Sequence, residues 1–248
     1  MENNFFEQGT DILPQTINLV KEHLSVEPYN LIFKSMTSAP KTPDLVQIRD
    51  TFQTPKYAVD LLLPFIPKDI KLIWEPACGN GKISKRLVEH GFDIWSTDIT
   101  FNYNCTDLTW NFTDSRNILE NQKVTAECII TNPPYSIKEL FIERAFEYNL
   151  PFAFLINADY SAKTIDWIQR GCEKIIPNRR IRFITPFIID RVNEEEKTNY
   201  QTVEEIPPQL LYKYSSSQFH SMWLTYGFNI GRTETFVDLP IKEMKENV

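Results

Sequence analysis

The chain has 248 residues, of which 42% are apolar and 24% are charged, so it is large and apolar enough to bury a core. Its net charge of −7 argues against a protein that coats nucleic acid by bulk charge, but it does not exclude a local basic groove. The apolar runs are much shorter than the ~20 residues that cross a bilayer, and the N-terminus does not resemble a secretory signal. We therefore expect a cytoplasmic protein without a membrane span. Four cysteines without a C-x-x-C pair, beside three histidines, predict free thiols and no structural metal.

The predicted elements begin with a helical N-terminal extension over residues 1–50. From residue 51 onward, short β-rich runs alternate with amphipathic runs. We expect strands over 71–74, 93–97, 128–131, 151–156, 174–176 and 219–228, and helices over 83–90, 137–148 and 161–169. This alternation predicts an α/β fold with a mostly parallel sheet and helices on both faces. In such a sheet, ligands bind beyond the carboxyl ends of the strands.

Two later segments depart from this alternation. Residues 188–217 contain two glutamate runs and a proline pair, so we expect a long, partly mobile polar excursion. The charge-rich residues 236–248 are expected to form a tail. The predicted organisation is therefore an extension over 1–50, a main domain over 51–235 and a charged tail.

The first chemical signal is a glycine loop after the first of these strands. Gly79 and Gly81 allow a tight turn and a close approach of the backbone to a ligand, and Glu75 stands at the end of the strand. Asp98 closes the next strand, at a spacing that resembles an acidic residue gripping a ribose. A dinucleotide fingerprint needs a third glycine where this chain has Ser84, so NAD is disfavoured. A strand-to-helix turn without a ligand is the alternative interpretation.

The second signal is the segment Asn132-Pro133-Pro134-Tyr135, which follows another apolar strand. The two prolines fix both φ angles, so the Pro133 carbonyl and the Asn132 side-chain amide are held rigidly. Two such acceptors suit an exocyclic amino group with two hydrogens to donate. Tyr135 offers a flat face on which a planar base can stack. The alternative is a proline-rich surface turn.

Together these residues resemble the S-adenosylmethionine-dependent amino-methyltransferases of DNA, in particular those that methylate N6 of adenine. The resemblance rests on Asn-Pro-Pro-Tyr at 132–135, Glu-Pro-Ala-Cys-Gly-Asn-Gly at 75–81 and Phe-Gln-Thr-Pro at 52–55, which occur in the family's order. It covers roughly residues 51–228 and implies a Rossmann-like class I methyltransferase fold with a seven-stranded sheet. The small size resembles that of orphan or phage-borne enzymes, which implies a bacterial or phage-infected host cytoplasm.

The resemblance also implies a set of site residues. Those of the cofactor pocket are Thr54, Pro55, Glu75, Ala77, Gly79, Gly81, Asp98, Asp107 and Phe141. Asp98 would hold the ribose hydroxyls of S-adenosylmethionine and Asp107 its adenine amine, with Asp114 as a competitor for the second role. The catalytic loop would consist of Asn132, Pro133, Pro134 and Tyr135. No metal is implied.

For the DNA partner, the sequence offers one basic stretch. Residues 170–191 hold six basic and two acidic residues, a net charge of +4. Arg179, Arg180 and Arg182 are the candidate phosphate contacts, and a solvated strand face is the alternative. The spacing of the two loops leaves no room for a separate target-reading domain. The recognition sequence and the existence of a homodimer or a companion protein are left open.

Two alternatives to DNA adenine methylation remain. The same loop resembles those of protein-glutamine and ribosomal-RNA methyltransferases, and cytosine N4 is another possible acceptor. The form of the segments at 52–55 and 75–81 favours DNA adenine. The second alternative is a pseudo-methyltransferase that serves as a binding subunit, and the intact loops count against it.

Overall fold

The computed structural model describes residues 50–101, 105–217 and 219–248, which belong to one unit spanning Asp44–Val248. The helical extension predicted over residues 1–50 lies outside the described residues, apart from Asp50. Within the described part, no helix is long and apolar enough to cross a membrane.

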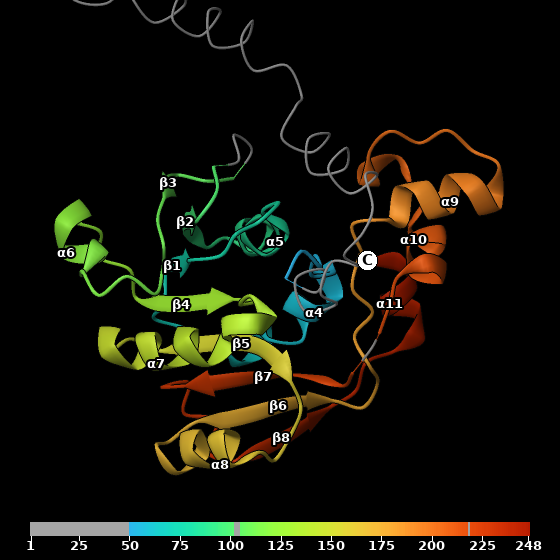
Figure 1. Ribbon diagram of the computed structural model, residues 1–248. Coiled ribbons are helices and arrows are strands. Elements are labelled where there is room, and N and C mark those ends of the chain that lie inside the picture. Colours follow the sequence, from blue (N-terminus) through green and yellow to red (C-terminus); the bar gives the residue numbers. More distant parts are fainter. Residues whose placement is uncertain (1–49, 102–104, 218) are drawn as a thin grey trace, which may run out of the picture. The chain divides into compact units, whose positions relative to one another are not determined.

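The described residues are organised around an eight-stranded sheet in the order β3-β2-β1-β4-β5-β7-β6-β8 (Figure 1). The strands are β1 Leu72–Glu75, β2 Asp93–Asp98, β3 Leu108–Thr109, β4 Cys128–Thr131, β5 Phe152–Asn157, β6 Glu173–Pro177, β7 Ser221–Tyr226 and β8 Glu234–Val237. Every pairing is parallel except those of β7, which runs antiparallel to β5 and β6. The predicted α/β, Rossmann-like fold with a mostly parallel sheet is confirmed, and the sheet has eight strands in the described part of the chain, where seven were predicted.

Helices and 3-10 turns connect the strands. The helices are α4 Lys56–Asp60, α5 Lys82–Glu89, α6 Ile118–Gln122, α7 Lys138–Tyr148, α8 Ala162–Gln169, α9 Ile188–Glu196, α10 Pro208–Tyr214 and α11 Ile241–Glu246. The 3-10 turns are η1 Leu63–Phe65, η2 Tyr135–Ile137 and η3 Val203–Glu205. The expected strand and helix positions between 71 and 176 agree with these elements to within one or two residues.

Both faces of the sheet are buried because successive side chains of a strand point to opposite faces. Ile73 and Ile130 pack on one face with side chains of α4, α5 and α11. Their neighbours Trp74 and Ile129 pack on the other face with side chains of α6, α7 and α8. The central strands are therefore continuously apolar, as parallel strands covered by helices on both faces usually are.

The segment 188–217 differs from the predicted polar excursion. It forms α9, η3 and α10, which share an apolar cluster that includes Ile188, Val192 and Leu211. Glu194 and Glu195 lie on the exposed side of α9. The acidic run therefore marks the solvated face of an amphipathic helix.

The segment 236–248 is also more ordered than a charged tail. It contains the end of β8, which pairs in parallel with β6, and the helix α11. Leu239 and Met244 are buried at 0% and 3% exposure and join the core on the α5 side of the sheet. In Figure 1, α11 lies beside α10.

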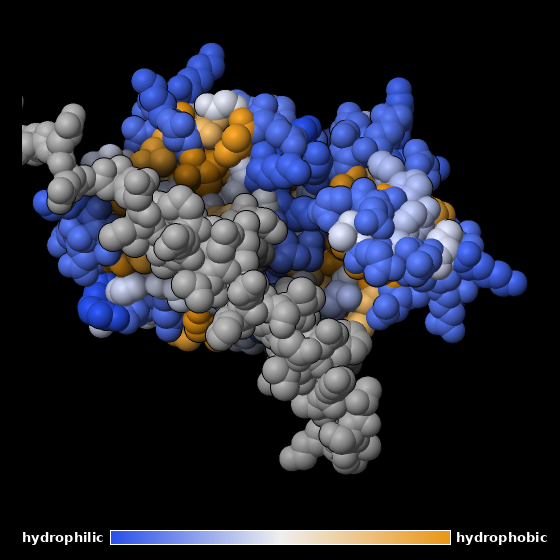
Figure 2. All heavy atoms as spheres, turned by 90° about the horizontal axis from the view of Figure 1, so that it is seen from above, coloured by the Kyte–Doolittle hydropathy of each residue, from blue (hydrophilic) through white to orange (hydrophobic). Residues whose placement is uncertain are grey.

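The surface seen from above is mostly polar, with apolar patches between the charged side chains (Figure 2). Large apolar side chains that are exposed within the described part include Ile99 and Phe101, after β2, and Phe236 on β8.

Candidate functional site

Two predicted motifs meet at one edge of the sheet. β1 and β4 are parallel neighbours, with Ile73 opposite Cys128 and Trp74 opposite Ile129. The glycine loop follows β1 and the Asn-Pro-Pro-Tyr segment follows β4, so both leave the carboxyl ends of adjacent strands. This is the edge at which open α/β sheets bind their ligands.

The glycine loop depends on left-handed backbone at both of its glycines. Gly81 has a φ of +70° and is the N-cap of α5. A Cβ atom there would lie 2.5 Å from the Cβ of Cys105, so only glycine fits. Gly79 has a φ of +52°, and a Cβ atom there would meet nothing within 4 Å in the described part of the chain. The loop is thus closed by Cys105 on one side and open at Gly79.

Glu75 supports this loop from beneath. Its side chain is buried at 1% exposure, and its carboxyl oxygen accepts the backbone N–H of Ser84 at 2.8 Å and the hydroxyl of Ser84. Ser84 lies in the first turn of α5, whose N-cap glycine has no side chain to offer. Burial raises the pKa of Glu75 to about 8, although the hydrogen bonds from Ser84 lower it. Glu75 thus holds the start of α5, whereas the resemblance implies a position near the polar groups of the cofactor. Ala77, in the turn that follows, is half-buried against the core.

Asp98 closes β2 next to the glycine loop. One carboxylate oxygen accepts the N–H of Gly79 at 2.9 Å, and the other accepts the N–H and hydroxyl of Thr100, each at 3.0 Å. A carboxylate offers about four acceptor positions. The described residues fill three of these positions, which leaves one position of Asp98 for a further donor, such as a sugar hydroxyl.

Asp107 lies away from this edge. It precedes β3, and its carboxylate accepts the N–H of Ser96, in the middle of β2, at 2.7 Å. The backbone N–H of Asp107 donates to the Ser96 carbonyl at 2.8 Å. Asp107 therefore pins two strands together ahead of their carboxyl ends. Its competitor Asp114 pairs with Arg116 at 2.8 Å. Neither placement favours the implied contact to an adenine amine.

Phe141 is part of the core. It lies on α7 at 4% exposure, with its ring 4.8 Å from that of Phe112. This side chain has almost no exposed face, so its placement does not support the implied role of Phe141 as a wall of the cofactor pocket.

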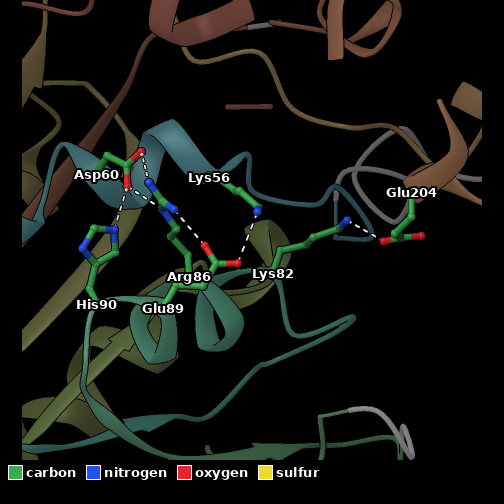
Figure 3. Close-up of polar contacts among 7 residues, drawn as sticks. All are labelled: Lys56, Asp60, Lys82, Arg86, Glu89, His90 and Glu204. Atoms are coloured by element: carbon green, nitrogen blue, oxygen red, sulfur yellow. Dashed lines mark hydrogen bonds and ion pairs between the residues drawn. The ribbon is translucent and has the colours of Figure 1, made fainter. Parts of the chain in front are cut away.

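Thr54 and Pro55 are buried and lead directly into α4, with Pro55 as the N-cap. An ionic network ties α4 to α5 (Figure 3). The Arg86 guanidinium donates to both oxygens of Asp60 at 2.7 and 3.0 Å and to Glu89 at 2.7 Å. Lys56 reaches the other oxygen of Glu89 at 3.2 Å, and His90 lies 3.7 Å from Asp60. The segment that carries Thr54 is thus fastened to the helix that follows the glycine loop.

The catalytic-loop candidates form one wall of a pocket. Its lining residues are Phe52, Asn132, Pro133, Tyr135, Lys138, Leu155, Ile156, Asn157, Phe183, Phe219 and Ser221. The Tyr135 ring stacks on Phe219 with centroids 5.5 Å apart and planes 29° apart. Lys138 Nζ lies 4.5 Å from the centre of the Tyr135 ring. Pro134 is half-buried and precedes the turn η2. No carboxylate or imidazole lines this pocket in the described part of the chain.

Sequence reasoning missed two partners of this loop. Phe219 stands at the start of the predicted strand over 219–228, and its aromatic ring was the available signal. Asp50 accepts the N–H of Ser136 at 3.0 Å and its hydroxyl at 2.5 Å, and so fixes the residue after Tyr135. Asp50 and Ser136 lie 86 positions apart, and no local pattern links them.

The three candidate arginines do not form one exposed cluster. Arg182 donates to the carbonyls of Tyr212 at 3.1 Å and Ser215 at 2.6 Å. Arg179 and Arg180 are both exposed, although Arg179 Nε also donates to the Leu239 carbonyl at 3.0 Å. Arg182 therefore serves the protein's own backbone, which removes it from the predicted phosphate surface.

Comparisons with known proteins give distant likenesses only. No family model matches the chain, and no curated protein matches it in sequence. Among solved structures, it is similar to a type I restriction-modification methyltransferase subunit from Streptococcus thermophilus, with a TM-score of 0.43 and 10% identity over 85% of this chain and 50% of that one. It is also similar to a dimethyladenosine transferase from Plasmodium falciparum, with a TM-score of 0.40 and 12% identity over 70% and 62% of the two chains.

A third similar structure is a SAM-dependent methyltransferase from Archaeoglobus fulgidus, with a TM-score of 0.39 and 11% identity over 80% of this chain and all of that one. The chain spans about half the length of the first of these proteins and 62% of the second. Likenesses at this level carry no argument about activity, which rests on the site itself.

Proposed function

We propose that this chain transfers a methyl group from S-adenosylmethionine to the exocyclic N6 amine of adenine in DNA. The observation that carries the proposal is the pocket in which Asn132, Pro133 and Tyr135 stand together at the end of β4, with Phe219 stacked on Tyr135. Amide and carbonyl acceptors beside an aromatic pair suit a planar ring that bears an amino group.

The cofactor would be held at the neighbouring strand ends. When bound, S-adenosylmethionine supplies an electrophilic methyl group on a positively charged sulfur. Gly79 leaves room for a close approach, and Asp98 keeps one acceptor position that a ribose hydroxyl can fill. These two features fit the cofactor, whereas Glu75 acts through α5 and Thr54 through its attachment to that helix.

The catalytic loop would act by positioning and electrostatics. The amine of adenine is a poor nucleophile because its lone pair is delocalised into the ring. Oxygens of Asn132 and Pro133 accept its hydrogens, favour a pyramidal nitrogen and direct the lone pair outward. S-adenosylmethionine held beside Gly79 and Asp98 would supply its methyl group to this nitrogen. The methylated nitrogen would be cationic and acidic and would lose its proton to solvent water, so the pocket needs no carboxylate.

DNA enters this pocket only as an extruded base. A stacked adenine cannot reach the end of β4, and flipping it out costs a few kcal/mol. Stacking of the base against the aromatic pair formed by Tyr135 and Phe219 would offset part of that cost, since stacking on an aromatic side chain contributes roughly 1–3 kcal/mol per base.

The proposal is tested by incubating the full chain with radiolabelled cofactor and, separately, with duplex DNA, RNA and protein. We expect label in DNA, and we expect Asn132→Ala to lose almost all transfer while calorimetry still detects cofactor binding. Transfer to RNA or protein alone would replace DNA with the corresponding alternative substrate. The absence of both heat and thermal stabilisation by the cofactor would favour a binding subunit, because a ligand that binds the native state raises its stability.

A further inference from the structure

Two buried hydrogen-bonding atoms of this pocket lack a partner within the described residues. Ser221 Oγ and Asn157 Oδ1 are buried, and neither finds a partner among residues 50–101, 105–217 and 219–248. Both residues line the pocket together with Asn132 and Tyr135. The whole Ser221 residue is buried at 0% exposure. Because buried polar groups are normally paired, these two atoms point to a ligand that completes them.

The two residues form a pair across neighbouring strands. Asn157 ends β5 and Ser221 begins β7, and the two are directly opposite in the antiparallel register. Side chains of opposite residues lie on the same face of the sheet, with Cβ atoms about 4.5–5.5 Å apart. A single planar ring can therefore reach both side chains.

Asp159 sets the orientation of the Asn157 amide. Asn157 Nδ2 donates to one oxygen of Asp159, and the other oxygen accepts the hydroxyls of Ser161 and Thr164. Burial alone would raise the pKa of Asp159, but these hydrogen bonds lower the pKa by a larger amount. The pKa of Asp159 in the folded protein is therefore below its ordinary value. A carboxylate only accepts hydrogen bonds. The amide of Asn157 must therefore turn its NH2 group to Asp159 and leave its oxygen for the pocket.

We propose that Ser221 and Asn157 select adenine over cytosine as the base to be methylated, an inference that rests on the proposed function. The pair offers a hydroxyl that can donate and a carbonyl oxygen that only accepts. Adenine has two edges on which a ring nitrogen lies near the amine. On each of them, the next ring atom, further from the amine, carries a C–H group. Ser221 then donates to that nitrogen, and the C–H faces the oxygen of Asn157 in a weakly attractive contact.

Cytosine presents a different edge. Its ring nitrogen beside the amine is followed by a carbonyl oxygen. With Ser221 on that nitrogen, the carbonyl faces the oxygen of Asn157, and two acceptors without a hydrogen between them repel each other. Rejection of a competitor by such a mismatch is a common source of specificity.

The test uses the full chain and a DNA duplex that carries a site methylated by the wild-type protein. The target position holds adenine, 1-deazaadenine, 7-deazaadenine or cytosine. We expect Ser221→Ala to lower kcat/KM on adenine about tenfold, the effect of one hydrogen bond. The same substitution should have no effect on the analogue that lacks the contacted nitrogen. We expect Asn157→Ala to raise kcat/KM on cytosine relative to adenine, also about tenfold.

Thr235→Val is the matched control. Thr235 Oγ1, on β8, is another buried hydroxyl without a partner in the described part of the chain, and Thr235 does not line the pocket. Removing an unpaired hydroxyl should leave Tm unchanged or slightly higher in both Ser221→Ala and Thr235→Val. Only the first variant should lose activity on adenine.

Two results would overturn the inference while the proposed function stands. One is a Ser221→Ala protein that is fully active on adenine or that loses equally on adenine and both analogues. The other is an unchanged ratio of cytosine to adenine methylation in Asn157→Ala. A wild-type protein that methylates no DNA would instead refute the proposed function, before any variant is compared.

Discussion

Glu75→Gln gives a stability difference whose size and sign follow from burial. Burial raises the pKa of Glu75 from 4.5 to about 8 in the folded protein. The folded state therefore holds this proton more tightly than the unfolded state does. The resulting stabilisation is fully present below pH 4.5 and is lost as the pH rises through 8. At about 1.36 kcal/mol per pKa unit, the full loss is about 5 kcal/mol, an upper value for one buried carboxyl.

Glutamine stays neutral at every pH and keeps a carbonyl oxygen for the N–H of Ser84. The free energy of unfolding of Glu75→Gln should therefore approach that of the wild type at pH 5 and exceed it increasingly toward pH 9. Urea denaturation at five pH values, followed by tryptophan fluorescence, measures the difference. Glu89→Gln is the control, because the hydrogen bond from Arg86 lowers the pKa of Glu89. The difference in the free energy of unfolding between the wild type and Glu89→Gln should therefore be constant above pH 5. A constant difference between wild type and Glu75→Gln from pH 5 to 9 would refute the reasoning.

Three further predictions concern the two loops. Gly81→Ala should lower Tm by roughly 5 to 15 °C, because left-handed backbone and a clash with Cys105 together cost about 2–4 kcal/mol. Gly79→Ala introduces no clash, so thermal unfolding should show a smaller decrease in Tm for this variant. Equal decreases in Tm for the two variants would contradict this. Asp50→Ala should lower kcat about tenfold, because Asp50 fixes the residue that follows Tyr135, and Asp50→Asn should recover part of the activity. An unchanged kcat in steady-state kinetics would show that Asp50 does not position this loop. Phe219→Ala should lower kcat/KM about 10- to 100-fold by loss of stacking, while calorimetric cofactor affinity stays the same; a variant as active as the wild type would exclude stacking on Phe219.

The sheet could be predicted because its central strands are apolar on both faces. The runs that became β1, β4 and β5 are short, β-rich and followed by turn residues, so their positions agree with the sequence-based expectation to within one or two residues. The helix α9 was missed because the run at 194–196 dominates the composition of its segment. Ile188 and Val192, four positions apart, were the helical signal. β8 has too little apolar content to be recognised before it pairs with β6.

Some parts of the candidate site could likewise be predicted from the sequence, and others could not. The glycine loop and the Asn-Pro-Pro-Tyr loop could be predicted because their backbone chemistry is local. The place of Asp107 could not, because spacing alone does not tell which end of β3 it occupies. Contacts such as Asp50 with Ser136, or Asn157 with Ser221, join segments that only the sheet topology brings together.

The most direct test of the central claim is base-resolved mapping of N6-methyladenine in DNA from cells that express this chain. The proposed chemistry predicts methylated adenines in cells with the wild-type protein and none in cells with an equal amount of Asn132→Ala. DNA without N6-methyladenine in the presence of folded, cofactor-binding wild-type protein, or equal methylation by Asn132→Ala, would contradict it.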